Sequence, residues 1–335
     1  MPRANTNFER LLQGLTEAGF DRRHLNAAFP SWWTADAARE PGAVVELKIA
    51  LSRRLGIELE SLLDDEIHPR IVTPTGIRYK LREGTTASAL RPATGSLSAI
   101  AAAVSTASSH LPGAFVRGDP ASVRQKILSQ GARWLSLKGL LNWCWNNGVP
   151  VIPAPDLPGK RKMDAAVIFP DDRPIVFLTK NQSFSAWQLF ILAHELGHLG
   201  CGHVKPAQSL VDDDLNKDSS DPDERDAEEL AADRWAKNLL AVTKLALHRL
   251  MLCQHPNELA RVAQEEAKTH RTDAGHLILR AAFQTQSWQL ANAALNVLEP
   301  EPRGLDLARQ AARLNLDLGQ VADDSREFLE EIIGA

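Results

Sequence analysis

Two histidines and a glutamate in one apolar stretch are the residues best suited to chemistry. The stretch reads Phe190-Ile-Leu-Ala-His-Glu-Leu-Gly-His198 and holds His194, Glu195 and His198 in the pattern HExxH. On a helix, residues four apart lie on one face, so the two imidazoles can bind one zinc ion. Glu195 stands one position along, where it can act as the general base on a zinc-activated water. The pattern indicates metal-assisted peptide hydrolysis.

A zinc site of this kind needs a third protein ligand, and a later helix offers one. Residues 226–240 carry apolar side chains at helical spacing, and Glu229 and Asp233 lie four apart on one side. We predict that Glu229 binds the zinc while Asp233 accepts the outer N–H of a ligand histidine. Glu228 is the rival ligand, but Ala232 stands where its second carboxylate would be needed. The competing interpretation of Glu229 is one more carboxylate in an acidic stretch.

These two motifs resemble those of the ImmA/IrrE family of bacterial metallopeptidases. The family pattern is an AHELGH helix followed by E-x-x-A-[ND]-x-F-A, and here Trp235 stands where the family usually has Phe. The resemblance covers residues 115–260 and implies a small zincin-like domain, with a short β-sheet beside the HExxH helix and the Glu helix. It also implies a zinc endopeptidase that cleaves a helix-turn-helix repressor and relieves repression during DNA damage or phage defence. The helical N-terminal region with Pro30-Ser-Trp-Trp33 is most similar to the long CapP forms, which are paired with CapH repressors.

The rest of the chain is expected to position this site in an α+β, mostly helical fold. Short β-rich runs at Val149–Ile152, Ala165–Phe169 and Ile175–Thr179 are predicted to form a small sheet. The Asp-rich stretch 204–224 is too polar to pack in a core, and we predict a loop there. Ser96 is predicted to cap a short helix that follows it.

Four regions are expected along the chain. They are a helical N-terminal domain with a helix-turn-helix-like remnant, a connecting helix or linker, a zinc metallopeptidase domain and a helical C-terminal region. Their bounds are 1–83, 84–114, 115–260 and 261–335.

Apolar runs and cysteine content are the features of the sequence that indicate the cellular compartment. No run of about 18 uncharged apolar residues is present, so no membrane span is expected. The first ten residues lack an apolar secretory core, and Cys144, Cys201 and Cys253 form no CxxC pair. These features indicate a cytoplasmic protein. One alternative is a redox-sensing peptidase, in which Cys144 or Cys201 fills the open zinc position as an inhibitory thiolate.

Charge is unevenly distributed along the sequence. Residues 1–140 carry 18 Lys and Arg against 13 Asp and Glu, whereas residues 141–335 carry 20 against 29. Residues 71–138 hold nine basic side chains and two acidic ones, which predicts a phosphate-contacting face. The link of the family to DNA damage suggests single-stranded DNA as the activating ligand, and solvated arginines spread over several helices are the competing interpretation. The residues expected to contact phosphate are Arg78, Lys80, Arg82, Arg124 and Lys126.

Two questions stay open at this level. One is the donor that stabilises the oxyanion of the tetrahedral intermediate. Its candidates are His203, His248, His255 and Tyr79. The other is a different function, a DNA-binding regulator with a structural zinc site, which the repressor-like segment Leu55–Leu63 favours. A purely structural site, however, gains nothing from an intact Glu195.

Overall fold

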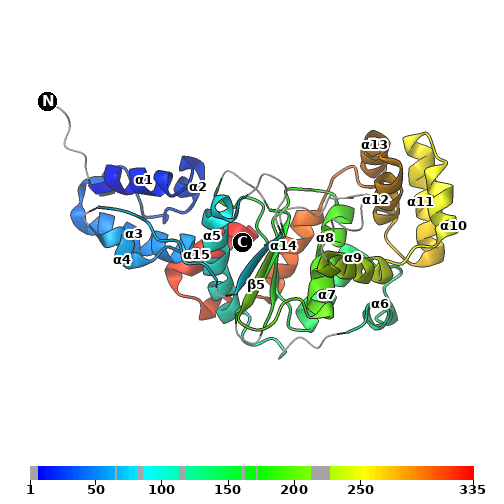
Figure 1. Cartoon of the computed structure of the whole chain (residues 1–335), viewed down its shortest axis with the longest axis horizontal. Coiled ribbons are helices and arrows are strands. Elements are labelled where there is room, and N and C mark those ends of the chain that lie inside the picture. Colours follow the sequence, from blue (N-terminus) through cyan, green and yellow to red (C-terminus); the bar gives the residue numbers. More distant parts are fainter. Residues whose placement is uncertain are drawn as a thin grey trace.

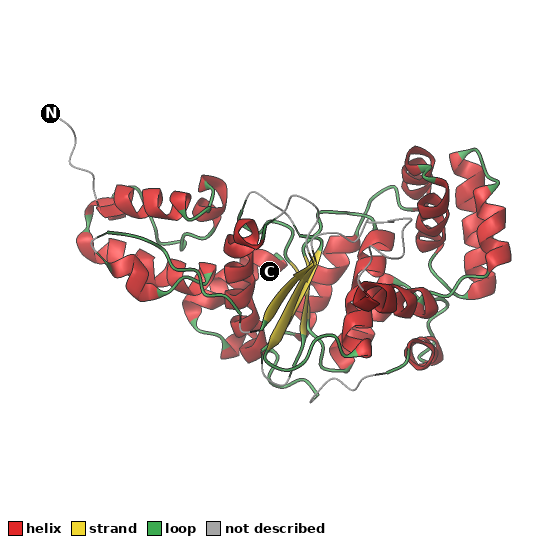
Figure 2. Ribbon diagram, in the orientation of Figure 1, coloured by secondary structure: helices red, strands yellow, loops and turns green. Residues whose placement is uncertain are grey.

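The chain forms an elongated, mostly helical α+β molecule with one sheet near its centre, which confirms the predicted fold class (Figure 1, Figure 2). Helices lie on both sides of the sheet along the long axis. The computed structural model describes residues 7–64, 66–74, 76–80, 86–112, 118–159, 163–170, 173–212 and 227–335.

The sheet has five strands in the order β1-β5-β3-β4-β2. Strand β3 runs antiparallel to both β4 and β5, whereas β1 is parallel to β5 and β2 is parallel to β4. Every residue of β2, β3 and β4 is buried, as expected for apolar strands with both faces covered. The bounds are Ile77–Lys80 (β1), Val151–Pro153 (β2), Ala165–Phe169 (β3), Ile175–Leu178 (β4) and Gln208–Asp212 (β5).

Strands β2, β3 and β4 confirm the three predicted β-runs, but β1 and β5 were not predicted. The prediction of a loop is wrong for residues 208–212, and residues 213–224 lie outside the described part of the chain. Leu210 of β5 pairs with Arg78 on one side and with Val167 on the other. Strand formation here depends on partners that are distant in sequence, and local composition does not reveal them.

The largest hydrophobic core surrounds the sheet and joins it to helices from separate parts of the chain. Helix α5 begins well before the predicted cap, so Ser96 is buried inside the helix and the capping prediction is wrong. Packing of α5 against β4 and against α3 (Pro41–Leu55) overrides the local preference of serine for a helix start. The main helices of this core are α5 Ala87–Ala107, α7 Leu137–Asn146, α8 Ser185–Cys201, α9 Ala227–Leu239 and α14 Gly304–Asn315.

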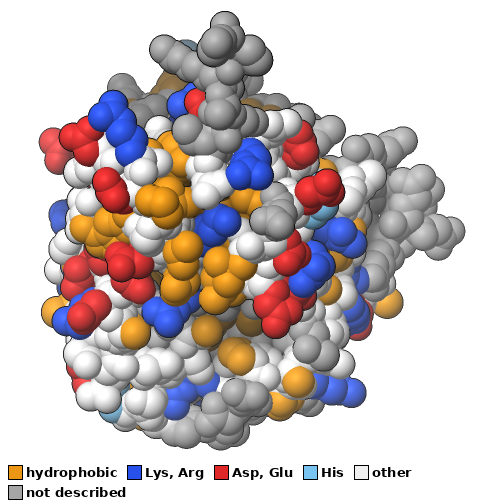
Figure 3. Space-filling view, turned by 90° about the vertical axis from the view of Figure 1, so that its left-hand side faces the viewer, with side chains coloured by type: hydrophobic (Ala, Val, Ile, Leu, Met, Phe, Trp, Pro, Cys, Tyr) orange, Lys and Arg blue, Asp and Glu red, His pale blue; other side chains and the backbone are white. Residues whose placement is uncertain are grey.

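The N-terminal helices form a smaller core of their own at one end of the molecule. The C-terminal helix α15, Asp323–Ile333, packs against α3, where Arg54 pairs with Glu327. Figure 3 shows this end of the molecule, with apolar side chains gathered among charged ones. The elements at this end are α1 Asn7–Glu17, α2 Arg22–Ala27, η1 Ala37–Arg39, α3 Pro41–Leu55 and α4 Leu59–Leu63, while η3 Leu318–Gln320 precedes α15.

Four helices at the opposite end form a third cluster (Figure 1). Ala186 and Trp187, from the first turn of α8, are buried in this cluster, and α12 packs directly on α8. No helix of the described residues is both long and apolar enough to cross a membrane. The four helices, which we call the distal helices, are α10 Lys244–Met251, α11 Pro256–His270, α12 Ala274–Thr285 and α13 Trp288–Leu298. Helix α6, Pro120–Ser129, lies nearby against α9.

Candidate metal centre

Helix α8 places two histidines side by side. The helix is buried over residues 186–199 because its sequence is apolar on nearly all sides. It ends at Gly202, whose φ of 77° favours glycine. The Nε2 atoms of His194 and His198 are 3.0 Å apart, and both side chains are buried. The structure therefore brings the two imidazoles together as their spacing predicts.

Helix α9 brings a carboxylate to the same point. The Oε2 atom of Glu229 lies 3.2 Å from Nε2 of His194, and its Oε1 lies 3.4 Å from Nε2 of His198. Glu228 instead pairs with Arg78 at 2.9 Å and with Lys80 at 3.4 Å. The geometry thus selects Glu229 over Glu228 as a companion of the two histidines.

The close approach of α8 and α9 requires a glycine on α8. A Cβ atom added at Gly197 would lie 2.6 Å from the carbonyl oxygen of Ala232. We expect Gly197→Ala to push the two helices apart and to lower the free energy of unfolding by about 1–3 kcal/mol. Metal affinity should fall as well, because Glu229 moves with α9.

Urea unfolding and a metal titration test this prediction. The matched control is Gly42→Ala on α3, where an added Cβ meets nothing within 4 Å. The control should leave metal affinity unchanged. Equal stability of Gly197→Ala and the wild type would show that the helix contact tolerates a side chain.

Asp212, at the end of β5, is the fourth member of the cluster, and sequence reasoning missed it. Its Oδ2 atom lies 3.5 Å from Nε2 of His194, and the residue is 1% exposed. The ligand atoms of His194, His198, Asp212 and Glu229 all lie within 4.8 Å of one another. Four donors in a tetrahedron around one zinc ion are roughly 3.3 Å apart, so this spacing fits a single ion. The sequence signal for Asp212 is the short β-rich run that precedes it, which lies within the stretch predicted to be a loop.

A set of four protein donors closes a zinc site, whereas a catalytic site keeps one position open. We expect Asp212 to hold the fourth position, so Asp212→Asn should open it to small ligands. In the cobalt-substituted variant, azide should change the visible absorption spectrum, while the wild-type spectrum should stay the same. Metal affinity should fall by roughly tenfold or more. Identical azide responses in the two proteins would remove Asp212 from the coordination sphere.

Both histidines have partners for their outer nitrogens. The Nδ1 atom of His194 lies 3.0 Å from Oδ1 of Asp233, in the arrangement predicted for Asp233. The Nδ1 atom of His198 lies 3.0 Å from Nδ1 of His203, and the N–H of His198 can donate to it. Such contacts turn both Nε2 atoms toward the centre of the cluster.

The remaining candidates for an oxyanion donor lie in different environments. The hydroxyl of Tyr79 is 3.5 Å from Oγ1 of Thr94. His248 on α10 and His255 before α11 are both exposed. Within the described structure, His203 is the one candidate of the four that contacts a histidine of the cluster. That contact orients the ring of His198.

Glu195 lies inside the site without being one of the four donors. It is fully buried, and neither of its carboxylate oxygens has a hydrogen-bond partner among the described residues. Burial raises the pKa of Glu195 well above its usual range. A buried carboxylate with no protein partner fits a group that acts on a bound water.

The electrostatics of the cluster suit a cation. Burial alone would lower the pKa of His194, but the carboxylates of Asp212, Asp233 and Glu229 raise it well above its usual value. Three carboxylates around one buried imidazole therefore favour a positive charge at this point. A divalent ion supplies that charge, and nitrogen and carboxylate oxygen donors suit zinc.

Two of the residues predicted to contact phosphate instead contact other residues of the protein. Arg78 on β1 donates to both carboxylate oxygens of Glu228 and to the carbonyl oxygen of His203. The Nζ atom of Lys80 lies 3.4 Å from Glu228 and 3.9 Å from Glu229. These two cations therefore hold β1 against α9 beside the metal cluster.

Arg124 also has a structural role. Its guanidinium donates to the carbonyl oxygens of Leu239 and His270, at the ends of α9 and α11. Lys126 is exposed, and Arg82 lies outside the described residues. Three of the four described cations are thus used in internal contacts, and they do not present a free basic face.

The cysteines lie away from the four donors. Cys144 is buried in the central core, and burial raises the pKa of its thiol far above the usual range. Cys201 is exposed at the last residue of α8. Neither thiol belongs to the group of donors found among the described residues, so the geometry does not favour an inhibitory thiolate.

Comparison with known proteins finds one family model that matches part of the chain. Residues 149–266 match the model of the IrrE N-terminal-like domain, Peptidase_M78. This match covers β2 to β5, α8, α9 and the start of the distal helices, and it supports a metallopeptidase of the ImmA/IrrE type. No curated protein and no solved structure matches the chain.

Proposed function

We propose that this protein is a zinc-dependent endopeptidase that cuts a helix-turn-helix transcriptional repressor. The observation that carries the proposal is the meeting of His194, His198 and Glu229 beside the buried Glu195, whose carboxylate has no hydrogen-bond partner in the described part of the chain. The matched peptidase family supports the reaction class. Zinc, when bound, would act as a Lewis acid that activates water and polarises the scissile carbonyl.

Side chains around the metal position supply proton transfer and hold the ligands in place. Glu195 takes the proton from the attacking water and returns it to the leaving amine. Asp233 and His203 hold the two imidazoles in the orientation and tautomer that point Nε2 inward. Asp212 must leave its position near His194 for water or substrate to enter, so its displacement accompanies activation.

The proposal also names the protein substrate and the signal that activates cleavage. We propose that the enzyme acts in the cytoplasm on a repressor encoded beside it, and that cleavage relieves repression during phage defence or DNA damage. The cations of residues 71–138 that stay exposed are the basis for proposing single-stranded DNA as the activator. The DNA would then use exposed cations such as Arg91 and Lys126, because Arg78 and Arg124 are engaged internally.

The test is co-expression of the protein with the neighbouring repressor, followed by mass spectrometry of the repressor. We expect one specific cut with the wild type and an intact repressor with Glu195→Gln. Purified components with and without a single-stranded oligonucleotide, at low and moderate salt, test the signal. Equal fragments with wild type and Glu195→Gln would contradict the proposal.

A second candidate function is a DNA-binding regulator with a structural zinc site. The specific observation in its favour is Asp212, which completes a closed set of four donors. The helix α3 and the short helix α4, joined through Gly56 at φ 65°, resemble the end of a repressor domain. If the site is structural, Asp212→Asn weakens metal binding and no repressor is cut by either protein. If the site is catalytic, the Asp212→Asn variant still cleaves the repressor.

A further inference from the structure

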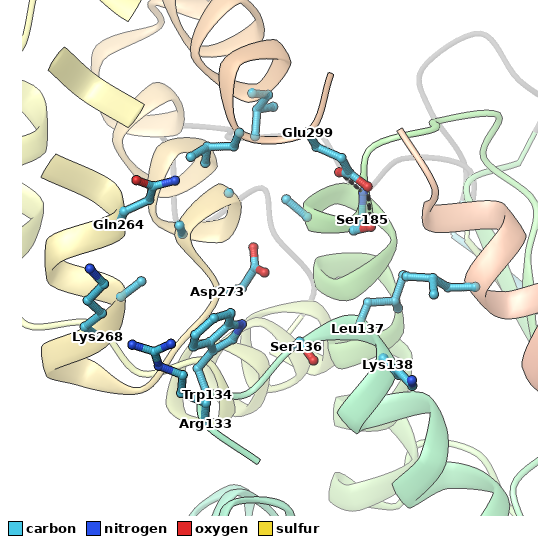
Figure 4. A pocket seen from close by; sticks show the side chains of 17 residues that line it. Arg133, Trp134, Ser136, Leu137, Lys138, Ser185, Gln264, Lys268, Asp273 and Glu299 are labelled. Carbon is cyan, nitrogen blue, oxygen red and sulfur yellow. Dashed lines mark hydrogen bonds between the residues drawn. The ribbon is translucent and has the colours of Figure 1, made fainter. Parts of the chain in front are cut away.

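A separate cavity lies where the distal helices meet the start of α8 (Figure 4). Its volume is about 490 Å³, which is within the usual range for small-molecule sites. None of its lining residues belongs to the metal cluster. The cavity includes Trp134, Ser185 in the first turn of α8, Lys268 on α11 and Asp273 before α12.

Three cations line this cavity without an ion pair. Arg133, Lys138 and Lys268 have no carboxylate partner among the described residues. In Figure 4, Arg133 and Lys268 project from the same side of the cavity. An anion placed between them would meet one guanidinium and one ammonium group, neither of which is paired with a carboxylate of the described residues.

The two carboxylates of the cavity are already in use as helix caps. Glu299 accepts hydrogen bonds from the backbone N–H and the hydroxyl of Ser185 and from the backbone N–H of Arg303. Asp273 accepts the N–H of His276 at the start of α12. Asp273 nevertheless faces the cavity beside Trp134, where it can accept a further hydrogen bond from a ligand hydroxyl (Figure 4).

Three helices begin at this cavity. Ser136 caps α7, Ser185 starts α8 and Asp273 caps α12, and all three residues line the cavity. The N-terminal end of a helix carries a partial positive charge, but the carboxylates of Glu299 and Asp273 already face the ends of α8 and α12. The attraction for an anion therefore comes from the cations and from the end of α7.

The cavity also offers an aromatic surface on a fixed segment. The indole of Trp134 lines the cavity, with the guanidinium carbon of Arg133 5.3 Å from its ring centroid. Arg271 holds this segment in place by donating to the carbonyl oxygens of Ala132 and Arg133, and it accepts the N–H of Leu135. A planar ring can stack on such a tryptophan, and arginine adds a cation–π contribution.

We propose that this cavity binds a ribonucleoside monophosphate. Its base lies against Trp134, its phosphate lies between Arg133 and Lys268, and a ribose hydroxyl donates to Asp273. The ligand would span the first turn of α8 and the distal helices, and would hold these two parts of the molecule together.

The experiment is isothermal titration calorimetry of the full-length protein with AMP, GMP, CMP and UMP. We expect saturable binding of at least one of them, and a weaker response to its deoxy form and to inorganic phosphate. Lys268→Glu and Arg133→Glu should each weaken binding by about tenfold or more, because each removes a charge-assisted contact. The matched control is Lys244→Glu, an exposed lysine in the first turn of α10 that does not line the cavity.

Trp134→Phe should retain binding and Trp134→Leu should lose it, with thermal melts confirming that both variants fold. No saturable heat at millimolar nucleotide overturns the proposal. So does equal weakening by Lys244→Glu and Lys268→Glu. Binding of a single-stranded oligonucleotide much more tightly than any monophosphate would assign the cavity to a nucleic-acid strand and overturn the assignment to a free nucleotide.

Discussion

Glu195→Gln should abolish cleavage of the partner protein while leaving the metal in place. Loss of a positioned general base typically costs about 10²- to 10⁴-fold in rate. Glu195 is not among the four donors, so the metal content should stay at the wild-type level. The buried carboxylate also lies near the charges of Asp212 and Glu229, which help to raise its pKa. Its replacement by a neutral amide removes this repulsion, so the fold should not be weakened.

The measurement combines three readouts on one preparation. Rates of repressor cleavage, metal content and thermal unfolding are compared for the wild type and Glu195→Gln. A fall in rate with unchanged metal and unchanged unfolding assigns a chemical role to Glu195. Retained cleavage would mean that the peptide bond is broken elsewhere.

Glu229→Gln should remove most of the metal. The two oxygens of Glu229 lie 3.2 Å from His194 Nε2 and 3.4 Å from His198 Nε2, so the substitution takes away a negatively charged donor. Loss of a residue that hydrogen-bonds to a metal ligand typically lowers metal affinity by about 10- to 100-fold. We expect Asp233→Asn to fall in that range and Glu229→Gln to exceed it.

The neighbouring carboxylate provides a matched control. Glu228→Gln makes the same chemical change one residue away, in a side chain that pairs with Arg78 and Lys80. Competition with a chelator of known affinity should give a metal affinity close to that of the wild type for Glu228→Gln. Equal affinities for Glu229→Gln and Glu228→Gln would exclude Glu229 from the coordination sphere.

Local periodicity was enough to locate the centre of the site. His194 and His198 meet because residues four apart share a face of any α-helix, whatever surrounds the helix. The same rule puts Glu229 and Asp233 on one side of α9, where one approaches both histidines and the other contacts His194. Periodicity also distinguished Glu229 from Glu228, since adjacent residues on a helix point in different directions.

Contacts between distant segments decided the rest. Asp212 reaches His194 only because β5 is paired between β1 and β3, and those partners lie far away in sequence. Arg78 and Arg124 looked like free cations in a basic stretch, yet folding places acceptors from α9 and α11 beside them.

The sequence by itself therefore determined the helical motifs, the pair of histidines, Glu195 and the helix that carries Glu229. These features follow from spacing within one helix, and a helix closes its hydrogen bonds within four residues. Only the tertiary structure decided the closure of the donor set by Asp212, the contact of His203 with His198 and the cavity beside Trp134. Each of these depends on elements that meet across the fold, and strand pairing and helix packing are set by partners that no local pattern identifies.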